Sequence, residues 1–171
     1  ECLDLLLKDQ KGSRQKLEEA LIASNKAYEG FKTLKCSSGE LSQVIRNYAA
    51  EAKRIESIAK EFLLLMDACE VYNQAMELTE KPGNPHEEVL SRLETCQTRL
   101  DEILNVHDSM MTEMEEVKED YLIPHLMRDL TMMRNAFLKL HSRLAEIVDS
   151  IRESRGSLEL VPIEWILTGK G

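Results

Sequence analysis

The chain has 171 residues and a net charge of −9; 43% of its residues are hydrophobic, 31% are charged and only 5% are aromatic. This length suffices for one domain with a sizeable core and is short for two. Seven glycines and four prolines are too few for the many turns of a β-sandwich or barrel, and the apolar share excludes a disordered chain. No apolar run approaches the roughly 18 residues that a membrane-spanning helix needs.

The negative charge lies mainly in the second half of the chain. Residues 1–85 carry 12 basic and 14 acidic side chains, whereas residues 86–171 carry 10 and 17. Binding to nucleic acid needs a basic stripe that releases counterions, so we do not expect nucleic acid as a partner. The acidic residues among 113–120 form either a solvated helix face or a docking site for a basic partner.

Apolar or small residues recur at alternating steps of four and three along most of the chain, which is the pattern of a coiled-coil seam. The pattern predicts long helices over 17–36, 41–76, 93–121 and 126–151. Its clearest part is a seam of Leu41, Ile45, Tyr48, Ala52, Ile55, Ala59, Phe62, Met66, Cys69 and Met76. A similar seam runs through Leu93, Cys96, Leu100, Ile103, His107, Met110, Met114, Val117 and Tyr121.

Three breaks punctuate these helices. Near Ser38, a capping box formed by Ser37 and Glu40 predicts that one helix stops and another starts. The run around Gly83, which has a proline on either side, cannot stay helical. Pro124 shifts the apolar register and should kink or split its helix. Because Gly83 lies near the midpoint of the chain, the halves on its two sides should form an antiparallel hairpin.

The fold class is therefore all-α: a long antiparallel helical hairpin or coiled-coil-like bundle with breaks near Ser38, Gly83 and Pro124, spanning residues 1–156 as a single domain. The apolar stripe widens at Leu63, Leu64, Leu104 and Met111. A two-stranded seam needs only two apolar positions in seven, so the extra residues indicate a third contact surface. Either the chain folds back into a four-helix bundle, or the hairpin pairs with a second copy or another chain.

Residues 157–171 form a separate tail without the heptad pattern, beyond a helix stop at Gly156. The tail carries the only tryptophan, in a roughly alternating apolar series of Leu158, Leu160, Ile163, Trp165 and Leu167. Such a segment would be a sticky patch if it were exposed. We expect it to pack on its own bundle or on a partner chain.

No residue pattern indicates catalysis, a cofactor or a metal. None of the four histidines follows a glutamate at the Glu-x-x-His spacing of di-iron bundle sites, and zinc, phosphate-loop and nucleophile-elbow motifs are absent. We therefore expect a protein that is not an enzyme. His107 is the unusual seam residue: it is either partly exposed at the seam edge or a buried register lock whose charge changes near about pH 6.5.

The pattern favours a protein–protein interaction module, acting as an adaptor or spacer in a larger cytoplasmic assembly. An alternative is a membrane-surface module, because long proline-interrupted helices resemble the general plan of BAR-type domains. Binding to a membrane requires clustered basic residues, which the net charge disfavours. A lesser alternative is a secreted four-helix cytokine-like factor. The four cysteines, which lack zinc-ligand spacing, fit a reducing cytosol better.

Overall fold

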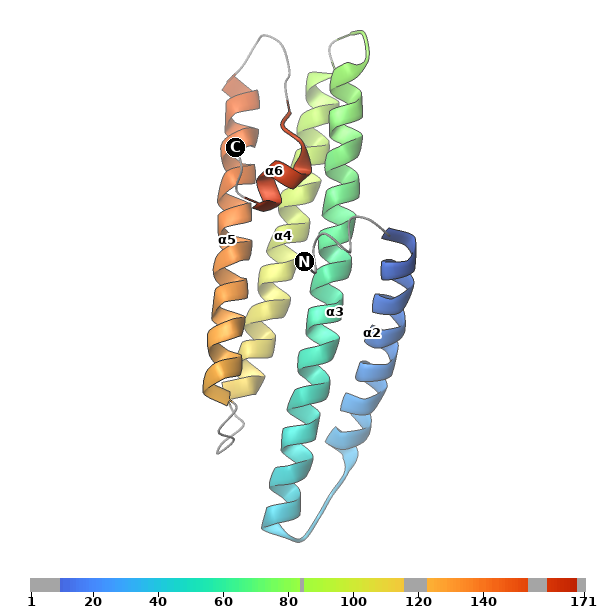
Figure 1. The fold of residues 1–171 in the computed structure, drawn as a ribbon, viewed down its shortest axis with the longest axis vertical. Helices are drawn as coiled ribbons and strands as arrows, with labels where there is room; N and C mark the ends of the chain where they lie inside the picture. Colours follow the sequence, from blue (N-terminus) through green and yellow to red (C-terminus); the bar gives the residue numbers. More distant parts are fainter. Residues whose placement is uncertain (1–9, 84, 116–122, 154–159, 169–171) are drawn as a thin grey trace. The chain divides into compact units, whose positions relative to one another are not determined.

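The computed structural model describes residues 10–83, 85–115, 123–153 and 160–168 (Figure 1). Within these ranges the chain is helical nearly throughout and contains no strand. Four long helices pack against each other, which confirms the predicted all-α helical bundle. The elements are α2 (Gln10–Thr33), α3 (Gly39–Glu80), α4 (His86–Glu115), α5 (Ile123–Glu153) and the short α6 (Ile163–Thr168).

The first break lies where it was predicted, but its cap differs by one position. At the start of α3, the backbone N–H of Leu41 donates to the Ser38 hydroxyl at 3.5 Å, and the N–H of Ser42 donates to the Ser38 carbonyl at 2.9 Å. Ser38, rather than Ser37, is therefore the residue that caps α3, and the predicted pairing of Ser37 with Glu40 is wrong. A serine at this position satisfies backbone donors that the first helical turn leaves without partners.

The other two breaks are also present. Gly83, with a φ of 119°, lies between α3 and α4 in a backbone conformation that side chains disfavour. The N–H of Val89 donates to the Pro85 carbonyl at 2.9 Å and so opens α4. Pro124 stands in the first turn of α5, where proline is tolerated because the N–H groups of that turn have no acceptor within the helix. Residues 116–122, which separate α4 from α5, lie outside the described residues.

The chain divides into two compact units. Unit 1 comprises residues 1–63 and 105–132, and unit 2 comprises residues 64–104 and 133–171. In unit 1, Tyr28 of α2 is buried and donates its hydroxyl hydrogen to Glu113 of α4 at 2.9 Å. The ammonium groups of Lys32 and Lys53 lie 5.1 and 5.3 Å from the centre of its ring. This single aromatic side chain thus connects α2 with α3 and α4.

The core of unit 2 is more apolar. It buries Tyr72, Ala75, Val89, Leu93, Cys96, Leu100, Ile103, Leu144 and Val148. Polar contacts between α4 and α5 surround this core: the His86 ring nitrogen Nε2 lies 2.7 Å from the Ile151 carbonyl, and Arg152 pairs with Glu94 at 2.6 Å. Within unit 2, the predicted heptad seam of α4 is therefore buried in the core.

Along α3, the predicted seam is buried in one part and open in another. Ala59, Met66 and Cys69 are buried, as the heptad pattern predicts. Leu41 and Tyr48 are 55% and 57% exposed, and Ile55 is 42% exposed, so the predicted burial of these three residues is wrong. The helical period was correct, but helix periodicity alone does not determine whether an apolar face finds a partner within the chain.

Candidate functional site

A buried carboxylate and a buried imidazole lie together in unit 1. Glu61 of α3 and His107 of α4 are both fully buried, and the glutamate oxygen Oε1 lies 2.8 Å from the histidine nitrogen Nδ1. The other ring nitrogen, Nε2, lies 2.7 Å from the backbone carbonyl of Leu130 in α5. The partly exposed position at the seam edge is therefore wrong for His107, which instead links three helices.

The partners of the ring determine how many protons the pair holds. A carbonyl oxygen only accepts, so Nε2 of His107 carries a hydrogen and donates it to Leu130. The contact between Nδ1 and the Glu61 oxygen needs one further proton, which lies on either atom. Both arrangements give the pair zero net charge, which is the state that costs least in a buried site.

Burial and mutual contact both shift the pKa values of the pair. Burial raises the pKa of Glu61, and this outweighs the opposing effect of His107. Burial by itself lowers the pKa of His107, but the hydrogen bond and charge of Glu61, with smaller contributions from the Leu130 carbonyl and Asp108, raise it above its ordinary value. Each group thus holds its proton more tightly in the folded chain than in the unfolded chain.

We expect this pair to make stability fall as the pH rises. With both pKa values raised by folding, its contribution is full below the ordinary values of 4.5 and 6.5 and is lost as the pH passes through the raised ones. Urea unfolding between about pH 6 and pH 9 measures the slope. The double variant Glu61→Leu/His107→Leu should show a shallower decline, and an unchanged slope would contradict the assignment.

Sequence reasoning missed Glu61. It lies two residues from the seam position Ala59, and nothing in the sequence distinguishes it from the many glutamates on solvated faces. Its second oxygen, Oε2, is buried and has no hydrogen-bond partner among the described residues. A buried oxygen without a hydrogen bond destabilises the folded state, so this atom of the Glu61–His107 pair lowers the stability of the bundle at this point.

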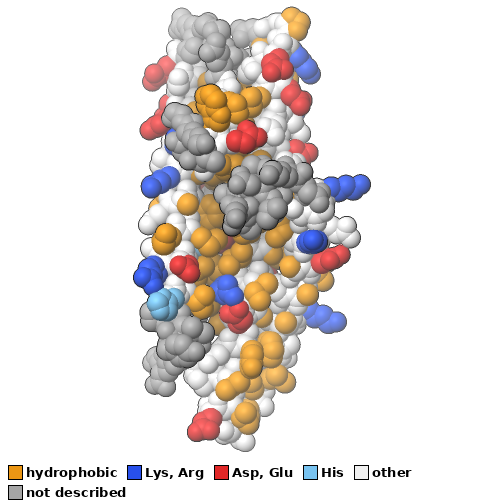
Figure 2. All heavy atoms as spheres, in the orientation of Figure 1, with side chains coloured by type: hydrophobic (Ala, Val, Ile, Leu, Met, Phe, Trp, Pro, Cys, Tyr) orange, Lys and Arg blue, Asp and Glu red, His pale blue; other side chains and the backbone are white. Residues whose placement is uncertain are grey.

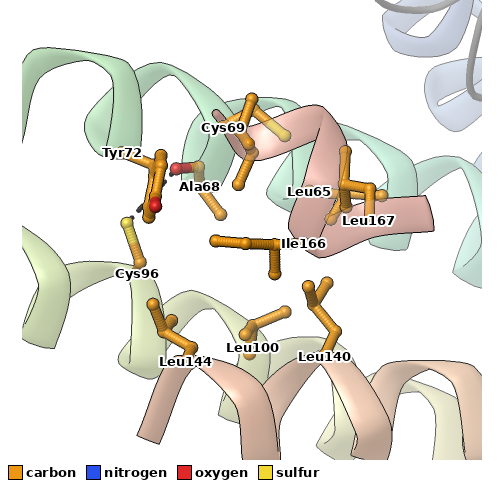
Figure 3. Close-up of a pocket in the computed structure, with 11 residues that line it drawn as sticks. Leu65, Ala68, Cys69, Tyr72, Cys96, Leu100, Leu140, Leu144, Ile166 and Leu167 are labelled. Carbon is orange, nitrogen blue, oxygen red and sulfur yellow. Dashed lines mark hydrogen bonds between the residues drawn. The ribbon is translucent and has the colours of Figure 1, made fainter. Parts of the chain in front are cut away.

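The tail forms a second candidate site, in unit 2. Residues 163–168 form the helix α6 rather than an extended alternating segment, and the Tyr72 hydroxyl donates to the Val161 carbonyl at 2.6 Å. Figure 3 shows Ile166 pointing into a slot between α3, α4 and α5, with Leu100 and Ala68 on either side. The cavity left in this slot has a volume of only about 20 Å³. The tail therefore packs on its own unit.

Helical spacing changes which tail residues are anchors. Ile163 and Ile166, three positions apart, are buried, whereas Trp165 is 50% exposed. Leu160 and Leu167 are half-buried, and Gly156 and Leu158 lie outside the described residues. Ile166 was not among the predicted tail residues, although its spacing from Ile163 is typical of one face of a helix.

Two cysteines line the slot beneath α6. Burial raises the pKa of both thiols to about 12, with Glu164 adding to the effect at Cys69 and the Cys69 charge adding to it at Cys96. The Cys96 thiol donates to the Ala68 carbonyl at 3.2 Å. Thiols held in the protonated form react slowly, so these cysteines act as small core residues.

The apolar residues proposed as a third contact surface are distributed over both units. Leu63 and Met111 belong to unit 1, and Leu64 and Leu104 belong to unit 2. Leu64 is buried, and the other three are half-buried. Because none of the four is exposed, the open apolar surface of the described residues lies elsewhere.

An aligned set of exposed apolar side chains lies on one side of the first half of α3, in unit 1. Leu41, Val44, Tyr48 and Ile55 recur at steps of three, four and seven, and each is more than 40% exposed; we name them the α3 apolar face. Figure 2 shows hydrophobic side chains gathered over this end of α3. Phe31 of α2 stacks on Tyr48 with 5.6 Å between ring centres, so α2 borders the face.

Known proteins add no functional information. No family model, curated protein or solved structure matches the chain. No group of three His, Cys, Asp or Glu side chains within the described ranges is placed to hold a metal ion. No helix among the same residues is long and apolar enough to cross a membrane. The function must therefore be argued from the buried pair, the α6 slot and the α3 apolar face.

Proposed function

We propose that this chain is a non-catalytic helical protein–protein interaction module, an adaptor or spacer in a larger cytoplasmic assembly, and that the α3 apolar face is its docking surface. The observation that supports this is the exposure of four large apolar side chains on one side of one helix. Scattered exposed apolar residues are ordinary, whereas an aligned set typically marks an interface.

The spacing of the face suits a helical partner. Leu41 and Ile55 are 14 residues apart, or about 21 Å along the helix axis at ~1.5 Å per residue. Side chains repeating at steps of three and four along that length are what a second amphipathic helix packs against. The Phe31–Tyr48 stack adds aromatic area to the border of the face, and aromatic groups often dominate binding energy at interfaces.

The alternatives have less support. A membrane-surface module would need a basic face, whereas the chain has a net charge of −9. A secreted cytokine-like factor would commonly carry disulfides, but Cys36, Cys69 and Cys96 are all free thiols. Free thiols are the usual state in a reducing cytoplasm, which is why we propose that compartment.

Site-specific crosslinking in cells tests the proposal. A photoreactive phenylalanine replaces Val44 on the face, and the matched control replaces the exposed Arg46, which lies about 200° around α3. We expect a discrete protein adduct from position 44 and none from position 46. Equal labelling at both positions, or crosslinks only to lipid, would argue against a protein docking surface on this face.

A further inference from the structure

An open groove lies between α5 and α6 in unit 2. Its volume is about 560 Å³, within the range of ligand-binding clefts. The apolar lining comes from Leu138 and Leu140 of α5 and from Ile166 and Leu167 of α6. The groove therefore exists because the tail packs as a helix, since α6 supplies one of its walls.

Two cations share this lining, Lys139 and Arg143. They stand four residues apart on α5, so they are about 6 Å apart along the helix axis. The surrounding stretch of α5, residues 130–145, carries Arg134 as a third cation and no acidic residue. In a chain with a net charge of −9, the described lining of this groove is mainly apolar, with two cations and no carboxylate.

We propose that the α5/α6 groove binds an acidic amphipathic helix of a partner protein. Carboxylates one helical turn apart on the partner match the spacing of Lys139 and Arg143, and apolar residues on the same side of that helix fill the groove. Trp165 precedes the lining residue Ile166 on α6, about 100° around the helix, and is half exposed, so its emission can report a partner that covers α6.

The shape and charge of the groove favour this ligand over two others. A fatty acid would leave much of its chain in water in an open groove, whereas lipid-sized ligands are normally enclosed. An anionic membrane is recognised by four to eight clustered basic residues. The lining of this groove offers two, Lys139 and Arg143. A helix with an acidic and an apolar side meets both features of the groove.

The test uses the full chain and the fluorescence of Trp165, its only tryptophan. The probe is a synthetic helical peptide of about five turns with leucines at steps of three and four, and with glutamates one turn apart beside them. It contains no tryptophan or tyrosine. A second peptide carries lysine in place of each glutamate. We expect saturable quenching or a spectral shift with the acidic peptide, weakened by added salt.

Two matched charge reversals locate the site. Lys139→Glu should weaken binding of the acidic peptide by about fivefold or more, because a surface ion pair contributes up to about 1 kcal/mol and the reversal adds repulsion. Lys16→Glu, which makes the same charge change at an exposed position of α2, should bind like the parent chain. Both lysines are exposed, so unchanged melting temperatures check that neither variant misfolds.

Three results would overturn the proposal. The first is equal affinity for the acidic and basic peptides, or no binding of either. The second is equal weakening by Lys139→Glu and Lys16→Glu, which would reflect net charge alone. The third is co-sedimentation with phosphatidylserine vesicles that Lys139→Glu abolishes, because it would assign the groove to a lipid surface. None of these results bears on crosslinking at Val44, so the two proposals fail independently.

Discussion

Replacing Glu61 with leucine should lower the free energy of unfolding by about 3–5 kcal/mol, the range found when one partner of a buried charged pair is removed. The cost arises because His107 keeps its place in the core but its Nδ1 atom loses its hydrogen-bond partner, Glu61. His107→Leu should cost a similar amount, since it leaves the Glu61 carboxyl group buried without its hydrogen-bond partner. Urea unfolding followed by circular dichroism measures both effects.

The double variant Glu61→Leu/His107→Leu separates the pair from the packing around it. With both side chains gone, neither leaves the other without a partner, although the Leu130 carbonyl of α5 loses a donor. Apolar replacement of a buried pair is often neutral or stabilising. We therefore expect the double variant to be more stable than either single variant, with a coupling energy of a few kcal/mol, ~1–3. Additive losses in the double variant would contradict the assigned coupling between Glu61 and His107.

The double variant also addresses the register hypothesis for His107, which stays a prediction. A polar pair in a helical core can specify one alignment of the helices at some expense in stability. If this pair does so, the double variant should be stable yet show broadened amide spectra or a changed oligomeric state. The register hypothesis would be wrong if the double variant kept one sharp set of amide signals and the oligomeric state of the parent chain.

Ile166→Ala should lower the free energy of unfolding by about 2–4 kcal/mol, because Ile166 is 3% exposed and fills the slot beneath α6. Truncating it enlarges a void that is already present among Leu65, Leu100 and Leu144. Thermal or urea unfolding measures the loss, and the emission of Trp165 reports whether α6 has left its unit.

The neighbouring residues provide the controls for this prediction. Trp165→Phe should change stability by less than about 1 kcal/mol, since half of the tryptophan is in water. Tyr72→Phe should cost about 1 kcal/mol by removing the hydrogen bond to Val161. A larger loss at Trp165 than at Ile166 would mean that the tail is anchored by the tryptophan, as the alternating pattern suggested.

Much of the architecture could be predicted from local signals. The heptad spacing predicted the helices, and Pro124, the prolines around Gly83 and the serines near Ser38 predicted their ends. These signals are short-range. A proline removes a hydrogen-bond donor within its own turn, and the apolar residues of a helix repeat every seven positions whichever element packs against them. The cap was misplaced by one residue because adjacent serines at 37 and 38 are equivalent in pattern.

The candidate sites were less predictable, since each depends on residues that are distant in sequence. Glu61 and His107 are 46 residues apart, and Tyr72 meets Val161 across 89 residues. A glutamate beside a seam is normally solvated, so only a histidine placed opposite it explains its burial. The α5/α6 groove likewise requires that the tail return to α5 as a helix.

By itself, the sequence determined that this protein is a bundle of long helices with three breaks and an apolar tail that needs cover, because helix period, capping and proline chemistry act within a few residues. Only the tertiary structure decided which apolar surfaces are buried within the chain. It covered the tail with unit 2, buried a Glu–His pair in unit 1, and left Leu41, Val44, Tyr48 and Ile55 open. The physical reason is that a helix face is buried only if another face packs against it in the folded chain. Apolar faces of similar composition look alike in the sequence, so the sequence does not show which of them pack together.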